Sequence, residues 1–421
     1  MTVVELFDVS PLQNLSGVLN FPADTIYFAG SNYRLMTQNE KVYRDILLRY
    51  GIKAEIKYLC IPKYDISFAV EKFCEIAKSD KDVIFDVSGG DDYILAAAGI
   101  AAGRCASSGI ALQHFSVRSG RFVSFGNAEH VSQRKGRINL TADEMIELHG
   151  GKIVYEDEKR SGTVRWDFEK DDFREDVLKM WNLCRRDCRE WNKNCARMGE
   201  LENFAHSLIG DRYAVLDEVS IPKKYALSSG KSALLCELTP HLETLAANGL
   251  ITRYTNSSKI LKFCFKNRQV RGCLLKAGNA LELMTYMTAK NLKNRHGINM
   301  FSDTLSGVVL DWDGKIHTGN DIIKDTENEI DGLFIKGMIP VFVSCKNGNV
   351  DENELYKLSC VAEKFGIKYA KKVLVATDLQ KSYTSQQRFY GRATEMGIKI
   401  IDGVHRMTES EFARKLASIQ R

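Results

Sequence analysis

Short runs rich in Val, Ile, Phe and Tyr alternate with helical stretches over the first 155 residues of this 421-residue chain. This alternation predicts a parallel sheet covered by helices on both faces, that is, a Rossmann-like domain of the α/β class. Sheets of this kind bind ligands in the crevice beyond the carboxyl ends of their strands. The expected strands are 3–7, 25–29, 54–60, 83–87 and 110–117, and the expected helices are 39–50, 66–78 and 93–106.

The rest of the chain shows two other patterns. A long polar segment, 170–198, predicts one long helix, and a helix, a glycine and a hairpin over 232–265 resemble a winged-helix unit. The last region predicts a helix, three short strands, and then helix, strand, helix and strand. We therefore expect a Rossmann-like domain at 1–155, a helical and winged-helix-like connector at 156–272, and a third α/β domain at 273–421.

Composition excludes several classes of protein. Hydrophobic residues make up 44% of the chain and prolines number only six, which excludes extended disorder and a collagen-like fold. The eleven cysteines have no repeated spacing, which favours a reducing compartment over a disulfide framework. The N-terminus is acidic where a signal peptide is basic, and no apolar run reaches the roughly 18 residues of a membrane span. We expect a cytoplasmic protein with no membrane partner.

The net charge of +5 is too small to indicate a nucleic-acid partner by itself. Residues 251–276, however, hold seven Lys or Arg residues and no acid. Such a cluster contacts phosphates in nucleic-acid-binding proteins, but it is equally typical of a solvated face. Both interpretations stay open at the level of the sequence.

Two loops of the N-terminal region combine small polar residues with the end of a strand. The first expected strand runs into the segment DVSPLQN at 8–14, and the fourth runs into DVSGGDDY at 86–93. Both loops should meet at the same edge of a parallel sheet. The main-chain N–H groups of Ser88, Gly89 and Gly90 suit a phosphate if a helix begins there, although a tight turn explains the glycines equally well.

The last region contains carboxylates that can serve hydrolysis of a phosphodiester. Without an organic cofactor, this reaction needs a divalent cation held by carboxylates, and a lysine beside the cation can stabilise negative charge. Glu329 and Asp331 lie two residues apart and share one face of an extended chain. Glu282, in the preceding helical run, is a third candidate ligand.

The apolar strand expected at 341–346 ends in a lysine, which is unusual because a central strand would have to bury its charge. Ser344 and Lys346 share one face of this strand, and Cys345 faces the other way. An acid on the neighbouring strand is the natural partner for Lys346. By itself, however, an Asp331–Lys346 pair is also explained as an ordinary cross-strand ion pair.

Asp331, followed by a short strand that ends in x-Lys within this pattern of helices and strands, resembles the PD-(D/E)xK nuclease superfamily. The resemblance implies a restriction-endonuclease-like domain that binds Mn²⁺ or Mg²⁺, with Asp331 as the main metal ligand and Lys346 as the catalytic lysine. The chain departs from the family pattern at Ser344, where the family has an acid. The implied catalytic residues are Glu282, Glu329, Asp331, Ser344 and Lys346, and the implied metal ligands are Glu282, Asp331 and the main-chain carbonyl of Cys345.

The whole arrangement resembles the CRISPR-associated Rossmann-fold (CARF) effector nucleases of type III CRISPR defence. In that family the CARF domains of two subunits pair and bind a cyclic oligoadenylate, most often cyclic tetra-adenylate, which activates degradation of nucleic acid. The resemblance therefore implies a homodimer, this ligand, and DNA or RNA as substrate. The implied ligand-site residues are Ser10, Pro11, Gln13, Asn14, Ser31, Ser88, Gly89, Gly90 and Asp91.

We therefore expect a metal-dependent nuclease that a cyclic oligoadenylate activates and that cuts DNA or RNA with low sequence specificity. The middle segment is expected to transmit the ligand signal. Two alternatives remain: a nucleotide-sensing, DNA-binding regulator with an inactive nuclease-like domain, and a constitutive restriction or repair endonuclease. The expected phosphate contacts are Lys262, Lys266, Arg268, Arg271, Arg388 and Arg392.

Overall fold

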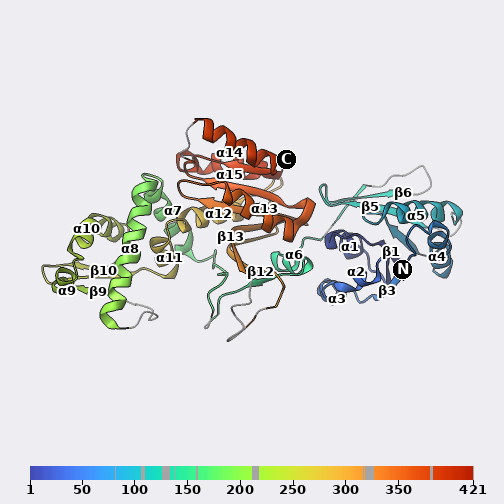
Figure 1. Cartoon of the computed structure of the whole chain (residues 1–421), viewed down its shortest axis with the longest axis horizontal. Helices are drawn as coiled ribbons and strands as arrows, with labels where there is room; N and C mark the ends of the chain where they lie inside the picture. The colour runs from blue at the N-terminus through green and yellow to red at the C-terminus, as the bar shows by residue number, and fades with distance from the viewer. Residues whose placement is uncertain are drawn as a thin grey trace.

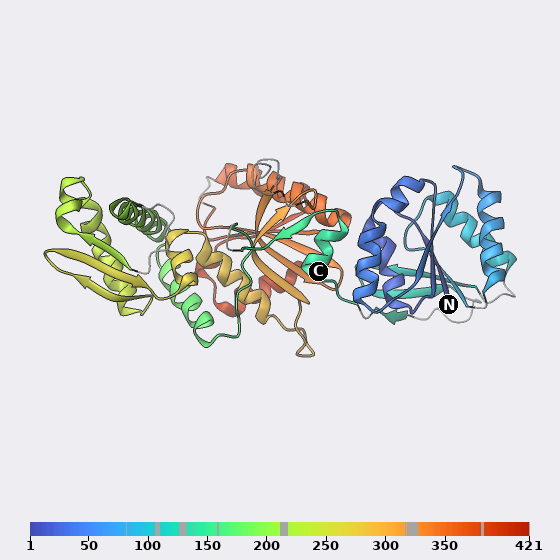
Figure 2. The same ribbon diagram turned by 90° about the horizontal axis from the view of Figure 1, so that it is seen from below.

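The computed structural model describes residues 1–80, 82–105, 110–125, 133–136, 138–157, 160–210, 218–315, 317, 327–379 and 383–420. Its three parts lie in a row (Figure 1): an N-terminal sheet domain at one end, a second sheet domain in the centre and a winged-helix unit at the other end. Helices cover both faces of each large sheet (Figure 2). None of the described helices combines the length and the apolar character that a membrane span needs.

The N-terminal sheet is parallel through its first five strands, as the sequence predicts. The central strands β1 and β4 are buried along their whole length, including the acids Glu5 and Asp86. Two antiparallel strands extend the sheet to the order β3-β2-β1-β4-β5-β6-β7. The strands are β1 (Thr2–Leu6), β2 (Thr25–Gly30), β3 (Glu55–Cys60), β4 (Val83–Asp86), β5 (Ala111–Ser116), β6 (Arg121–Phe125) and β7 (Gln133–Lys135).

Amphipathic helices pack on both faces of this sheet. The first three share a core with Val3 and Phe28 on one face, and the next two share a core with Val4 and Phe85 on the other. The last residue of the helix expected at 93–106, Ala106, lies outside the described residues. The helices are α1 (Pro11–Ser16), α2 (Tyr33–Gln38), α3 (Glu40–Arg49), α4 (Ile66–Ser79) and α5 (Asp92–Arg104), with a 3-10 turn at Val18–Asn20.

The central domain is built on a mixed sheet of order β16-β15-β14-β13-β12-β8. Helix α12 packs on the face that carries Val341 and Val343, and α13 packs on the face that carries Phe342. The elements are α12 (Asn279–Asn291), β12 (Asp303–Asp311), β13 (Glu327–Lys336), β14 (Ile339–Lys346), α13 (Asn353–Gly366), β15 (Lys371–Ala376), α14 (Tyr383–Glu395), β16 (Ile398–Ile401) and α15 (Glu409–Ala417), with 3-10 turns at Ile367–Tyr369, Val404–Arg406 and Ser418–Gln420.

Helix α6 (Ala142–Leu148) and strand β8 (Lys152–Val154) pack with this central domain, although the sequence analysis placed them within 1–155. Strand β8 pairs with β12, with Ile153 opposite Leu310, and α6 contacts α13, β12 and β13. A strand this short carries too little pattern for the sequence to assign it to one sheet or the other. The chain therefore passes from the first sheet domain to the second before α6.

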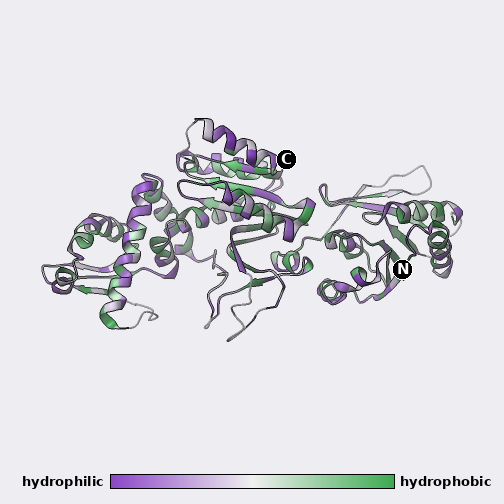
Figure 3. Cartoon of the chain, viewed as in Figure 1, coloured by the Kyte–Doolittle hydropathy of each residue, from purple (hydrophilic) through white to green (hydrophobic). Residues whose placement is uncertain are grey.

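The helix expected at 170–198 is two helices, α7 (Asp171–Cys184) and α8 (Cys188–Ile209). The chain breaks between them because Asp187 caps α8: its carboxylate accepts the N–H groups of Arg189 and Glu190 at 3.0 and 2.9 Å. Hydrophilic and hydrophobic residues mix along α8 (Figure 3), as expected for a helix with one buried face.

The winged-helix unit has a three-stranded antiparallel sheet of order β10-β11-β9. It lies on the side of the central domain away from the N-terminal domain (Figure 1), so the segment 156–272 does not connect the other two domains in space. Its elements are β9 (Val219–Pro222), α9 (Lys223–Ser228), α10 (Ser232–Ala247), β10 (Ile251–Asn256) and β11 (Ile260–Phe265), and α11 (Arg268–Leu275) returns the chain to the central domain.

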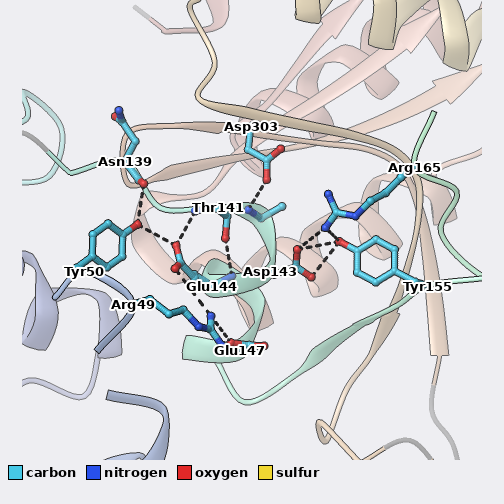
Figure 4. A network of polar contacts seen from close by, with 11 residues as sticks. Arg49, Tyr50, Asn139, Thr141, Asp143, Glu144, Glu147, Tyr155, Arg165 and Asp303 are labelled. Atoms are coloured by element: carbon cyan, nitrogen blue, oxygen red, sulfur yellow. Dashed lines mark hydrogen bonds and ion pairs between the residues drawn. The ribbon is translucent and has the colours of Figure 1, made fainter. Parts of the chain in front are cut away.

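Polar contacts around α6 join the N-terminal domain to the central domain (Figure 4). The hydroxyl of Tyr50, at the end of α3, lies 3.0 Å from Glu144 Oε2, and Arg49 pairs with Glu147 at 3.0 Å. From the opposite side, Asp303 of β12 accepts a main-chain N–H group of the first turn of α6 at 2.8 Å. Helix α6 is thus held by both domains at once.

Candidate functional site

Strands β13 and β14 part at the end that carries the expected catalytic residues. Their pairing stops at the residue next to Asp331, whereas β14 stays paired with β15 as far as Lys346. The carboxylate of Asp331 turns into this opening, where Oδ2 accepts the N–H of Cys345 at 2.6 Å and the hydroxyl of Ser344 at 3.2 Å. Asp331 is therefore oriented by the strand that ends in the lysine.

Lys346 lies between two carboxylates. Its ammonium is 4.0 Å from Asp331 Oδ2 and 2.9 Å from Oε2 of Glu354, which lies in the first turn of α13. Burial alone would lower the pKa of Lys346, but the two carboxylates raise that pKa above its ordinary value. Lys346 therefore stays charged at neutral pH and is suited to stabilise negative charge rather than to accept a proton.

Glu282 of α12 approaches the same region from the other face of the sheet. It shares a cavity with Glu329, and Glu329 in turn lines the cavity that contains Asp331 and Lys346. Burial, followed by repulsion from Asp331 and Glu329, raises the pKa of Glu282 to about 8. The structure therefore brings the expected carboxylates together with too little positive charge to balance them.

The donor chemistry of these residues fits Mg²⁺ or Mn²⁺, which prefer carboxylate and carbonyl oxygens. Burial and repulsion from Asp331 and Glu329 raise the pKa of Glu282, and a bound cation would offset this repulsion. Among the described residues, however, no three His, Cys, Asp or Glu side chains are grouped closely enough to hold a metal as they stand. Main-chain oxygens and waters would have to complete the coordination.

The thiol and the main-chain N–H of Cys345 contact different parts of the molecule. Its thiol is buried against α12, 3.6 Å from Thr285 Oγ1, as the strand alternation predicts. Its N–H is bonded to Asp331. The sulfur is therefore not a candidate ligand, and only the carbonyl of Cys345 keeps that possibility.

Asn347, directly after Lys346, ties the end of β14 to α8. Its Nδ2 donates to Asn192 Oδ1 at 2.7 Å, and Asn192 Nδ2 donates to the carbonyl of Asn347 at 2.6 Å. Thr377 adds a hydrogen bond to Asn347 Oδ1 at 3.0 Å. This reciprocal pair fixes the main chain that carries the lysine.

Sequence reasoning missed Glu354 and Asn192. A weak signal for Glu354 exists, since it opens the helix that follows the lysine strand, but Asp351 and Glu352 lie just before it. Only the tertiary structure decides which of these acids meets Lys346. Asn192 carries no signal at all, because its partner lies 155 residues away.

The expected ligand-site residues all lie at the carboxyl edge of β1, β2 and β4. Gln13 Nε2 donates to the carbonyl of Ser88 at 2.5 Å, and Ser31 Oγ donates to Asp91 Oδ2 at 2.8 Å. These two bonds join loops that are distant in the sequence. The residues brought to this edge are Ser10, Pro11, Gln13, Asn14, Ser31, Ser88, Gly89, Gly90 and Asp91.

Several of these groups are already used within the protein. Asn14 is fully buried and donates to the carbonyl of Asp8 at 2.8 Å. Gly90 has a φ of +106°, and a Cβ at Gly89 would lie 2.6 Å from that of Asp8, so both glycines are required by the fold of the loop. Two buried polar atoms, the hydroxyl of Ser10 and Oε1 of Gln13, have no hydrogen-bond partner among the described residues.

Two buried acids that the sequence analysis did not single out lie beneath this edge. Glu5 of β1 is directly opposite Asp86 of β4, and a Cβ at Gly17 would lie 1.6 Å from the Asp86 carboxylate. Asp86 accepts the N–H of Ser88 at 2.9 Å, whereas neither oxygen of Glu5 has a partner in the described part of the chain. Burial raises the pKa of Asp86 to about 6, and burial and Asp86 raise the pKa of Glu5 well above its ordinary value.

The basic cluster at 251–276 is largely neutralised by acids from other elements. Five of the six expected phosphate contacts already have acidic partners, four of them in this cluster. Arg388 is exposed on α14, and Arg392 lies 3.9 Å from Glu395. Ion pairs join Lys262 to Glu218, Lys266 to Asp176, Arg268 to Glu156, Arg271 to Glu202 and Lys276 to Glu329.

Known proteins resemble this chain in structure but not in sequence. No protein-family model matches the chain, and no curated protein matches it. The crystal structure of protein VC1899 from Vibrio cholerae has a TM-score of 0.72 at 17% identity, covering 99% of this chain and 97% of that one. Can2 from Sulfobacillus thermosulfidooxidans, solved in complex with cyclic tetra-adenylate, has a TM-score of 0.63 at 14% identity, covering 100% and 97%. The chain therefore shares its fold with both proteins over nearly its whole length, which confirms the fold expected from the resemblance to the CARF effector nucleases.

Proposed function

We propose that this chain is a metal-dependent nuclease of type III CRISPR defence that a cyclic oligoadenylate activates in the cytoplasm. The observation that carries the proposal is the convergence of Asp331, Lys346 and the partly buried Glu282 where β13 and β14 part. The fold shared with Can2, which was solved with cyclic tetra-adenylate, supports this nucleotide as the first activator to test.

The catalytic residues would divide the work between holding a cation and stabilising charge. Asp331 and Glu282 would hold the divalent cation, with the carbonyl of Cys345 as a further oxygen donor. When bound, such a cation lowers the pKa of a water and offsets charge on the phosphodiester. Lys346, which stays protonated, would stabilise the negative charge that develops on the phosphate.

A homodimer would match a cyclic ligand with two-fold symmetry, because each subunit offers the same loops. The ligand can favour the active arrangement only by binding it more tightly than the inactive one. The contacts of Tyr50 and Arg49 with α6 then supply the route from the N-terminal domain to the central sheet. This route replaces the middle segment that the sequence analysis favoured.

The regulator alternative has less support from the winged-helix unit. In DNA-reading helix-turn-helix folds, the second helix enters the major groove. The corresponding helix, α10, contains no Lys or Arg. Of its exposed acids, Glu237 pairs with Arg197 at 2.6 Å, and Glu243 would repel phosphates. We therefore propose that nucleic acid, DNA or RNA, is bound at the catalytic site and cut with little dependence on its sequence.

One experiment separates these functions. The purified protein is incubated with plasmid DNA and with single-stranded RNA in Mn²⁺ or Mg²⁺, with and without cyclic tetra-adenylate. Cleavage that requires the nucleotide and disappears in Asp331→Ala supports the proposal. Cleavage without the nucleotide indicates a constitutive endonuclease. Specific DNA binding without cleavage under any of these conditions indicates a regulator and overturns the proposal.

A further inference from the structure

The catalytic strand lacks an acid that its pattern leads one to expect. The PD-(D/E)xK pattern places an acid two residues before the lysine, and this chain has Ser344 there. The structure supplies a carboxylate to the lysine from another element: Oε2 of Glu354, on α13, lies 2.9 Å from the ammonium of Lys346. Glu354 also lines the same cavity as Asp331, Ser344 and Lys346.

We propose that Glu354 is a positioning residue for Lys346, holding the ammonium beside Asp331 without letting it pair fully with that carboxylate. The inference rests on the proposed nuclease function. Lys346 lies 4.0 Å from Asp331, so its closest ionic contact is with Glu354. If Glu354 were absent, the ammonium would lose its closest ionic contact and would no longer be held in place beside Asp331.

The orientation of Glu354 is itself supported by its surroundings. Its side chain is only 21% exposed, and Lys357, one turn further along α13, pairs with the other oxygen at 3.0 Å. Burial alone would raise the pKa of Glu354, but the two lysines lower it, so the carboxylate stays ionised at neutral pH. Glu354 therefore presents a fixed negative charge to Lys346.

The test compares Glu354→Gln with a matched control, Glu363→Gln, which removes an exposed charge from the same helix. We expect Glu354→Gln to lower kcat for ligand-stimulated cleavage by about 10- to 100-fold with little change in KM, because the lysine is misplaced rather than lost. The alkaline limb of the pH–rate profile should move to lower pH. Glu354→Asp should recover part of the rate, and adding Ser344→Glu to Glu354→Gln should recover more, because that position shares a face with Lys346.

A second measurement does not depend on activity. Acetic anhydride acetylates neutral amines, and mass spectrometry of the peptide that carries Lys346 gives its labelling rate at pH 8. Labelling of Lys346 should be several-fold faster in Glu354→Gln than in the wild type and in Glu363→Gln. Equal labelling in all three proteins overturns the inference, whether or not the protein cuts nucleic acid. Equal kcat in Glu354→Gln and Glu363→Gln, in a protein that loses activity in Asp331→Ala, overturns it as well.

Discussion

The carboxyl edge of the N-terminal sheet and the open end of β13 and β14 both gather acids and amides, but they balance them differently. At the N-terminal edge, Asp86 accepts hydrogen bonds from Ser88, and Asn14 is bonded to the main chain. At the proposed catalytic end, burial and the neighbouring carboxylates raise the pKa of Glu282 to about 8. The first edge is therefore a frame held mostly by internal hydrogen bonds, although buried oxygens of Glu5, Ser10 and Gln13 have no partner among the described residues. The second is a site that a cation would complete.

The largest effect is expected from removing the charges of the proposed catalytic residues. Asp331→Ala and Lys346→Ala should each lower ligand-stimulated cleavage by about 10²- to 10⁴-fold, because in the proposed mechanism one group holds the cation and the other stabilises the charge on the phosphate. Calorimetry should show unchanged affinity for cyclic tetra-adenylate, since the frame at the N-terminal edge is intact. A parallel loss of ligand affinity would show that the two sites are not separate.

The dependence of metal binding on pH tests whether the second site lacks a cation. Because Glu282 has a pKa of about 8, a cation must displace a proton from it at lower pH. The affinity for Mn²⁺ should therefore rise about fivefold from pH 7 to pH 8 and by no more than about twofold above that. Glu282→Gln should bind Mn²⁺ more weakly and with a flatter profile between these pH values. A steep profile that persists in Glu282→Gln would assign the proton to another group.

The link between the two sites can be weakened at α6. Tyr50→Phe removes a hydroxyl that lies 3.0 Å from Glu144 and leaves the ring in place. We expect the ratio of cleavage with ligand to cleavage without it to fall about fivefold, the effect of losing one hydrogen bond of about 1 kcal/mol from the coupling. Ligand affinity and the unstimulated rate serve as internal controls. An unchanged ratio would direct attention to contacts other than α6.

At the N-terminal edge, Glu5 is a buried acid whose two oxygens both lack a partner in the described part of the chain, and replacing it should produce the smallest effect. The folded-state pKa of Glu5 is raised above its unfolded value, so the stability of the wild type falls as pH rises from about 4.3 toward that raised pKa. Glu5→Gln removes this dependence. Urea unfolding should show the variant to be more stable by about 1 kcal/mol at pH 8 and no more stable near pH 4. Lower stability at both pH values would indicate that Glu5 has a partner that the carboxamide cannot replace.

Local pattern predicted those elements whose neighbours in the sequence are also their neighbours in space. The strands at 25–29 and 83–87 and the helix at 66–78 match β2, β4 and α4 closely, because their periodicity reflects a sheet and its adjacent helices. The prediction of a single helix over 170–198 was wrong. Asp187 caps a second helix there, and the periodicity of the sequence does not indicate this break. The domain boundary expected at 155 falls after β8, which pairs with β12 of the central sheet, because nothing local distinguishes the two sheets.

The sequence by itself determined the alternation of strands and helices and the candidate catalytic residues Asp331, Lys346 and Glu282, because these depend on periodicity and on residue chemistry. The tertiary structure alone decided which groups meet: Glu354 with Lys346, Asn192 with Asn347, and α6 between two domains. It also showed that the basic cluster is paired with acids from distant elements. These contacts join residues far apart along the chain, and their energy depends on distance and burial, which no local pattern records.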